Sequence, residues 1–391
     1  MNILDRLDAD QAWSDEERML LDSVRHLSDN VIAPRAAEFD RTSAFPWSNI
    51  NDINQLGLNA MFIPEAYGGS PMSYRCYLAC VREISKACAA TGIIWATNFH
   101  AIKPLIQFGT EEQKQRLLPR IAEGGLAALV ITEPSAGSDA TGMKTRFTRK
   151  GDHIEVTGSK IFISNGDVAD VYIVFGKWDG VDDPKKAIGA VVLEKGMPGL
   201  VVTGTEHKMG TRASGTASLS FEAVQVPVAN VLAPEGEGLR VLLTSLNKSR
   251  PSVAAHALGI ARAAFEDAVA YINERRQSGK RILEFQGIQF LVADLAAELA
   301  LCENWLWRVA AQVDQDQDDM GIEASILKLR ATDLAMRMAT ECVQLHGGYG
   351  YCADYRAERL MRDAKITQIW EGTNQIHRQL IGRSFLIKEK R

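Results

Sequence analysis

The feature that most constrains this fold is a change of hydrophobic periodicity between residues 126 and 232. This region holds short segments rich in valine and isoleucine, bounded by Gly, Asp, Asn or Pro: LAALVIT, HIEVTG, KIFIS, DVYIVFGKW, AIGAVVLEK, GLVVTG and LSFEAVQVP. Short apolar segments with turn residues between them are typical of successive β-strands. The chain must therefore build a small sheet or barrel in its middle third.

The two flanking regions have helical periodicity instead. Apolar residues recur at intervals of three and four from Leu20 to Ile32, and residues 238–276, 285–313, 322–345 and 356–388 read as longer helices. Four long helices with short breaks predict an antiparallel bundle. The expected fold is mainly α with a central β domain: an N-terminal helical domain (1–125), a middle β-barrel domain (126–235) and a C-terminal four-helix bundle (236–391).

Composition and charge exclude several classes of protein. The 44 basic and 49 acidic side chains give a net charge of −5, which argues against nucleic-acid or anionic-membrane partners. No apolar run reaches the ~18–20 residues that span a bilayer, and the acidic N-terminus has no signal-peptide pattern. We expect a soluble, cytoplasmic chain. Without CxxC pairs or HExxH spacing, the six cysteines are expected to be reduced and buried, and no metal is expected.

One carboxylate stands in an unusual sequence context. In KITQIWEGTNQIHR, Glu371 lies between Trp370 and a Gly-Thr-Asn turn, with aliphatic residues on both sides. Two interpretations are open from the residues alone. Glu371 is either an acid at a helix N-terminus near Thr373, or a base whose strength is tuned by apolar surroundings.

Four other motifs carry polar groups that a ligand could use. TEPSAGSD (132–139) follows an apolar strand, KIFISNG (160–166) alternates an aromatic with hydroxyl groups, ERRQSGK (274–280) ends a helix with three cations, and HGGYGY (346–351) is a glycine-rich turn. Each alone is equally consistent with a turn or a solvated surface. GEGLRVLL (236–243) lacks the third glycine and the βαβ context of a dinucleotide fingerprint, so a Rossmann site is not expected.

Taken together, these motifs resemble the acyl-CoA dehydrogenase family. PEAYGG, TEPSAGSD, VTGSKIFISNG, ERRQSGK, EFQGIQFLVADLA, VQLHGGYGY and LMRDAKITQIWEGT occur in the order and at the spacing of the family, from roughly residue 15 to 388. The resemblance implies the same three-domain architecture and an FAD-dependent enzyme. Such enzymes remove the α-hydrogen of an acyl-CoA as a proton and pass the β-hydrogen as hydride to flavin N5, giving a trans-2-enoyl-CoA.

By this resemblance Glu371 is the general base. An α-C–H beside a thioester is a weak acid, so Trp370 and an apolar helix face are expected to strengthen the base by desolvation. Some family members carry their base at the position of Ser249, and a serine cannot do that work. Substrate contacts are implied for Ser138, Asn247, Arg250, Gly372 and Arg383.

The resemblance also implies the FAD contacts. The isoalloxazine side would involve Leu129, Ile131, Thr132, Gly137, Ser138, Phe162, Ile163 and Ser164, with Phe162 covering one ring face. Arg275, Gln277, Ser278 and Gln286 would meet the diphosphate of a neighbouring subunit. Gln344, Gly347 and Gly348 would hold the adenosine side, and Thr373 and Gln375 would close the site.

Partners and substrate follow from the same resemblance. We expect a homodimer or homotetramer, an acyl-CoA substrate and an electron-transferring flavoprotein as acceptor. Bulky Trp95, Phe99 and Trp370 favour a short, branched or cyclic acyl group, although a carrier-protein thioester stays open; His100 and Tyr349 either shape the acyl pocket or pack in the core. The alternatives are an oxidase, an enoyl-thioester reductase, or a non-catalytic flavoprotein binder, against which Glu371 and the net acidity speak.

Overall fold

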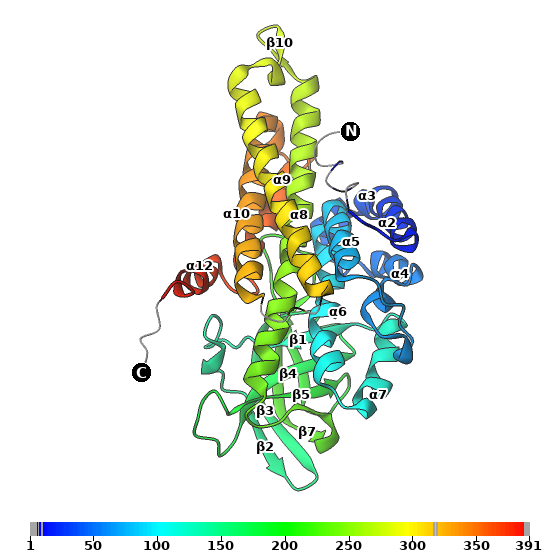
Figure 1. The fold of residues 1–391 in the computed structure, drawn as a ribbon, viewed down its shortest axis with the longest axis vertical. Coiled ribbons are helices and arrows are strands. Elements are labelled where there is room, and N and C mark those ends of the chain that lie inside the picture. The colour runs from blue at the N-terminus through cyan, green and yellow to red at the C-terminus, as the bar shows by residue number, and fades with distance from the viewer. Residues whose placement is uncertain (1–5, 7, 9–10, 316, 318–319, 387–391) are drawn as a thin grey trace.

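The N-terminal third of the chain is helical. The computed structural model describes residues 6, 8, 11–315, 317 and 320–386. Figure 1 shows these first helices packed against one side of the molecule. They are α2 (Asp15–Leu27), α3 (Ala33–Thr42), α4 (Trp47–Gln55), α5 (Tyr74–Ala87), α6 (Ala89–Phe108) and α7 (Glu111–Ala122).

The middle region is one eight-stranded sheet in the order β6-β7-β3-β2-β4-β5-β8, with β1 paired to β4. The predicted segments HIEVTG and KIFIS are a single strand, β3, whose pairing with β7 shifts twice at bulges. β2 and β8 were not predicted, because one is mostly polar and the other is very short. The strands are β1 (Ala127–Val130), β2 (Arg146–Lys150), β3 (His153–Ser164), β4 (Val171–Trp178), β5 (Ile188–Glu194), β6 (Leu200–Thr205), β7 (Thr216–Pro227) and β8 (Val231–Ala233).

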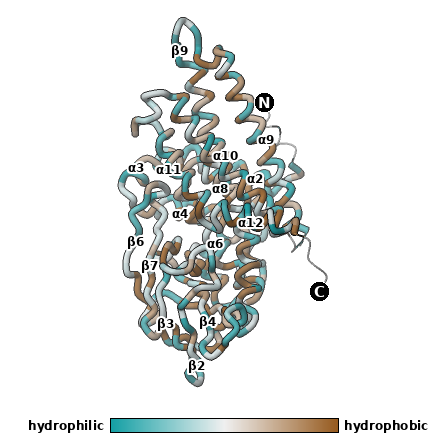
Figure 2. Tube along the Cα trace, turned by 90° about the vertical axis from the view of Figure 1, so that its left-hand side faces the viewer, coloured by the Kyte–Doolittle hydropathy of each residue, from teal (hydrophilic) through white to brown (hydrophobic). Residues whose placement is uncertain are grey.

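The C-terminal region is a bundle of long helices. α8 (Gly238–Glu274), α9 (Gln286–Asp314) and α10 (Gly321–His346) run side by side in Figure 1, and the small hairpin β9 (Arg276–Gln277) and β10 (Lys280–Arg281) lies at the end of the bundle far from the sheet. The predicted fold class, helical then β then helical, is confirmed. Figure 2 shows polar and apolar segments alternating along the helices, as expected where each helix buries one face.

The last predicted helix, 356–388, is broken in the structure. It forms α11 (Ala357–Thr367) and α12 (Asn374–Arg383), which projects sideways in Figure 1. The break is residues 368–373, called here the 368–373 turn. Glu371 and Gly372 both have positive φ, 50° and 94°, which an α-helix does not allow. Thr373 then caps α12 by accepting from the Ile376 amide.

Two further observations concern buried thiols and the membrane. Cys76, Cys80, Cys88 and Cys342 are buried as expected, but Cys302 is half-buried and Cys352 is exposed, so the prediction was wrong for these two. Cys352 lies in the loop after the glycine-rich turn, where no helix face covers it. Among the described residues, no helix is long and apolar enough to cross a bilayer, and no cluster of side chains could hold a metal ion.

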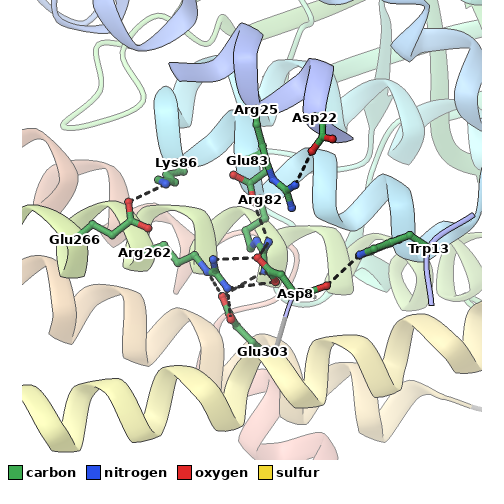
Figure 3. A network of polar contacts seen from close by, with 10 residues as sticks. All are labelled: Asp8, Trp13, Asp22, Arg25, Arg82, Glu83, Lys86, Arg262, Glu266 and Glu303. Atoms are coloured by element: carbon green, nitrogen blue, oxygen red, sulfur yellow. Dashed lines mark hydrogen bonds and ion pairs between the residues drawn. The ribbon is translucent and has the colours of Figure 1, made fainter. Parts of the chain in front are cut away.

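A buried ion-pair network joins the N-terminal region to the bundle (Figure 3). Arg82 of α5, only 1% exposed, donates to both carboxylate oxygens of Asp8 at 2.9 and 2.8 Å. Arg262 of α8 donates to Glu303 of α9 at 2.6 Å and pairs with Asp8 at 3.1 Å. Each arginine in the network has more than one carboxylate neighbour, since Arg82 also pairs with Glu83 at 2.9 Å, so every carboxylate supplies part of the compensation for a buried charge.

This network predicts a large effect of a single charge. Glu303→Gln should lower the free energy of unfolding by about 1.5–3 kcal/mol, because Arg82 and Arg262 each lose one charged hydrogen-bond partner while they keep Asp8. Glu298→Gln on the same helix is the matched control, since its partner Arg337 lies at the surface, and it should cost under ~1 kcal/mol. Denaturant unfolding measures both, and equal losses would contradict the argument.

Candidate active site

The carboxylate of Glu371 is held by a residue from the opposite helix. Ser249 of α8 donates from Oγ to Glu371 Oε2 at 2.6 Å. Ser249 therefore supplies a hydrogen-bond donor to the carboxylate that the sequence predicts as the base. Trp370 turns its indole toward His256 of α8, with ring centroids 5.5 Å apart. The immediate partner of Glu371 is thus polar, and not the apolar helix face that the sequence had led us to expect.

Two buried cations lie near this carboxylate. Arg250 of α8 is buried and donates from Nη1 to Asn247 Oδ1 at 3.0 Å; burial lowers its pKa, and Glu371 opposes that shift. Lys328 of α10 is fully buried, and burial lowers its pKa to about 7 against the opposing effect of Glu371. Both cations therefore interact electrostatically with the carboxylate of Glu371.

A neutral histidine completes this side of the site. His377 of α12 is fully buried, and its ring lies against the backbone of Glu371 and Gly372. Burial, together with the nearby charges of Arg250 and Lys328, lowers its pKa to about 3. A Cβ added to Gly372 would lie 3.1 Å from His377 Nε2. The ring therefore stays uncharged and leaves little room for any residue but glycine after Glu371.

The TEPSAGSD loop is fixed by a buried ion pair that the sequence reasoning missed. Glu133 accepts from the amides of Lys144 and Thr145 at 2.6 and 2.9 Å and pairs with Lys160 of β3 at 3.0 Å. Lys160 also donates to the Ile131 carbonyl at 2.7 Å, and burial lowers its pKa to about 8. Leu129, Ile131 and Thr132 are half-buried, whereas Gly137 and Ser138 are exposed, and a Cβ at Gly137 would meet nothing within 4 Å. The loop thus presents open backbone and a hydroxyl to solvent.

Phe162 of β3 is held in a conformation that packing does not explain. Its φ is 60°, it lies at a bulge between Lys160 and Ile163, and its side chain is 60% exposed. An exposed aromatic ring on strained backbone is the arrangement expected of a platform for a planar ligand. Ser164, two residues on, is half-buried. The side chain of Ile163 is buried in the core of the sheet, because side chains along a strand point alternately to its two faces. Only the backbone of Ile163 is therefore left for a ligand.

The predicted diphosphate and adenosine contacts gather at the other end of the bundle. Arg275, Gln277, Gln344, Gly347 and Gly348 line one open groove of about 540 Å³. Ser278 is at the tip of the adjoining hairpin with a φ of 50°, and Gln286 is an exposed residue at the start of α9. Tyr349 lines the same groove just after α10 ends at His346, and that end is about 27 Å along the helix from Lys328 at 1.5 Å per residue, so Tyr349 does not lie near Glu371.

The remaining predicted residues lie on α12 or just before it. Thr373 and Gln375 line a depression together with Asp333 and Arg378, and Arg383 is exposed at the end of α12. Trp95 and Phe99 of α6 are buried in an aromatic cluster with Phe62 and Tyr77, with centroid distances of 4.5–6.4 Å. His100 is buried beside them and interacts with Ser252 of α8.

Comparisons with known proteins agree with this architecture. Family models described as the acyl-CoA dehydrogenase N-terminal, middle and C-terminal domains match residues 14–125, 128–224 and 236–386. A cyclohex-1-ene-1-carbonyl-CoA dehydrogenase of Geobacter metallireducens is 41% identical over 376 residues, 95% of this chain and 98% of the relative. The chain belongs to the acyl-CoA dehydrogenase family.

Solved structures of this family superpose closely. Butyryl-CoA dehydrogenase from Megasphaera elsdenii has a TM-score of 0.93 at 38% identity, over 97% of this chain and all of the other. A chain from a structure described as an electron transferring flavoprotein of Acidaminococcus fermentans has the same TM-score at 40% identity and the same coverage. The protein is an oxidoreductase of the acyl-CoA dehydrogenase type, and its cofactor is FAD.

The residues present fit such a cofactor. A flavin needs a flat partner and hydrogen-bond donors at one end and a polar, cationic surface for the diphosphate at the other. The exposed Phe162 ring with the Thr132–Ser138 loop provides the first set, and the groove with Arg275 provides the second. Sequence reasoning missed four residues of the site: Lys160, Lys328, Asn374 and His377. The two lysines could have been noticed, because each is a charged residue at a buried position of its strand or helix.

The exposed aromatic yields a test of cofactor binding. Phe162→Ala should weaken flavin retention about three- to tenfold, since an aromatic stacking contact is worth ~0.5–1.5 kcal/mol. The flavin-to-protein ratio after gel filtration measures this. Trp47→Ala, at another exposed aromatic on α4, is the control and should retain flavin normally; equal loss in both variants would argue against a platform.

Proposed function

We propose that this chain catalyses α,β-dehydrogenation of an acyl-CoA thioester, with Glu371 as the base that removes the α-proton. The observation that carries the proposal is the geometry at Glu371. Its carboxylate is held by Ser249 at 2.6 Å and lies near the buried cations Arg250 and Lys328. An acid that only capped a helix would not need partners from two other helices. Bound FAD would supply the acceptor for the β-hydrogen and its electron pair.

The surroundings of Glu371 suit proton abstraction from carbon. The α-C–H of a thioester is a weak acid, so a base must be ionised, oriented and close. Ser249 orients the carboxylate, and the positive charges of Arg250 and Lys328 lie near it. Negative charge that develops on the thioester oxygen needs donors in turn. The backbone N–H of Glu371 is the proposed donor, and Asn247, Arg250, Gly372, Ser138 and Arg383 are the proposed substrate contacts.

The proposed cofactor contacts require two chains. Arg275 follows Arg250 by 25 positions along α8, a distance of about 38 Å at 1.5 Å per residue. The residues proposed for the flavin ring and those proposed for the diphosphate therefore lie too far apart within one chain to contact the same FAD molecule. We propose that each FAD uses the ring-side residues of one subunit and the groove of another, so that a homodimer is the smallest active unit and a homotetramer consists of two such dimers.

The proposed substrate is a short, branched or cyclic acyl-CoA. In support, Trp95 and Phe99 fill the space between α5 and α6 with Phe62 and Tyr77, which limits how deep an acyl chain can reach. Two of the similar proteins are named for butyryl-CoA and for cyclohexene-carbonyl-CoA. An electron-transferring flavoprotein is the proposed acceptor, in line with the flavoprotein structure that contains a similar chain.

The assignment of the base is tested by one substitution. Glu371→Gln should retain flavin but slow the anaerobic bleaching of flavin absorbance by acyl-CoA about 10²–10⁴-fold, because a positioned base contributes that factor. Stopped-flow absorbance measures the rate. Glu112→Gln, at an exposed acid on α7, is the control and should bleach like the wild type. Normal bleaching by Glu371→Gln would show that the base lies elsewhere.

A panel of thioesters tests the substrate and the acceptor. Butyryl, isobutyryl and cyclohexanoyl-CoA should bleach the flavin faster than octanoyl or palmitoyl-CoA under anaerobic conditions, because the aromatic cluster restricts depth. The same acyl groups on acyl carrier protein should react more slowly. Repetition in air distinguishes a dehydrogenase from an oxidase: rapid recovery of colour with hydrogen peroxide formation would contradict the proposed flavoprotein acceptor.

A further inference from the structure

A buried lysine contacts the 368–373 turn and its first following residue from α10. Lys328 is 0% exposed. Its Nζ donates to the Gly372 carbonyl at 2.7 Å and to Asn374 Oδ1 at 3.0 Å. An ammonium group at a fully buried position is costly even when it is paired, and an apolar side chain would pack there at lower cost. The two hydrogen bonds of the ammonium group are therefore the reason to expect a specific role for this lysine.

The Gly372 carbonyl needs this donor because of the break in the helix. Residues 371 and 372 adopt positive φ, so the carbonyl at the break has left the helical hydrogen-bond ladder and would otherwise be buried without a partner. Asn374, the second acceptor, is buried and also bonds to Thr332 and Asp333 of α10 at 2.9 and 2.8 Å. Three positions of one helix, 328, 332 and 333, thus hold the residues that follow Glu371.

The charges around Lys328 come from every element packed against it. Glu371 precedes the contacted carbonyl, Arg250 faces it from α8, and Asp333 lies on α10 itself. His377 of α12 is neutral. Burial and Arg250 both disfavour the protonated lysine, whereas the two carboxylates favour it. The negative charge of Glu371 thus favours the protonated form of Lys328, in a setting that water reaches poorly.

We propose that Lys328 is a positioning residue for the dehydrogenation, which fixes the backbone at 372–374 so that Glu371 is aimed by Ser249 and which places a positive charge near the Glu371 carboxylate. The proposal rests on the proposed role of Glu371. It assigns two separable effects to one side chain: the hydrogen bonds hold the turn, and the positive charge attracts the carboxylate of Glu371. Thr332 contributes only to the first effect, through Asn374.

The test uses Lys328→Met, Lys328→Arg and Thr332→Val in the flavin-loaded protein. Lys328→Met should bleach about 10–100-fold more slowly, and the acid side of its rate–pH profile should move up by about one unit or more, since a lost neighbouring cation has that effect on an acid. Lys328→Arg keeps the charge and should restore the wild-type position of the profile. Thr332→Val should slow bleaching without moving the profile.

A second readout is independent of turnover. Backbone amides at 371–376 should exchange hydrogen with solvent faster in Lys328→Met and Thr332→Val than in the wild type, without substrate. Wild-type exchange and an unmoved profile in Lys328→Met would overturn the proposal, as would identical profiles for Lys328→Met and Lys328→Arg. If Lys328→Met does not fold, Asn374→Ala removes one acceptor and keeps the charge, and unchanged exchange in that variant would also overturn it.

These experiments distinguish a wrong role for Lys328 from a wrong proposed function. If Glu371→Gln bleaches normally, Glu371 is not the base, and both proposals fall. If Glu371→Gln is inert while Lys328→Met matches the wild type in rate, profile and exchange, only the role of Lys328 is wrong.

Discussion

The interruption of the last helix is the constraint on which the candidate site depends. In a continuous helix over 356–388, the backbone at Glu371 would be helical, and the turn that brings its carboxylate to Ser249 would not form. Two consecutive residues with positive φ end α11 and start α12 in a new direction. Such backbone is strained at Glu371, which has a Cβ, and it persists only where the surroundings enforce it. Here Lys328, Thr332 and Asp333 enforce it from α10.

Charge is used in two ways along α8. Arg262, in the second half of the helix, belongs to a buried network in which each guanidinium faces a carboxylate, and this network fastens α5, α8 and α9 together. Arg250, in the first half, donates to Asn247, and among the described residues its Nε has no hydrogen-bond acceptor. A buried cation with unused hydrogen-bond donors lowers the stability of the fold, but it can bind a group on which negative charge develops.

The length of α8 explains why one chain does not complete the proposed cofactor site. The hairpin with Ser278 and the groove with Arg275 lie at the end of the bundle opposite the sheet (Figure 1), whereas Phe162 and the Thr132–Ser138 loop belong to the β region. A rigid helix keeps these sets apart, and no loop movement could bring them together. A second copy of the chain is the simplest way to join them.

The sequence by itself determined the order of helical, β and helical regions, because hydrophobic periodicity is a local property that each segment records. It also singled out Glu371, the TEPSAGSD loop and the glycine-rich turn, since their residue types are unusual in their segments. Tertiary structure alone decided what Glu371 touches: Ser249 lies 122 positions earlier and Lys328 contacts the residue after it from another helix. The same holds for Ile163, which faces the core, and for the break that turned one predicted helix into two. Such contacts depend on how elements pack against each other, and a period along the chain carries no record of that.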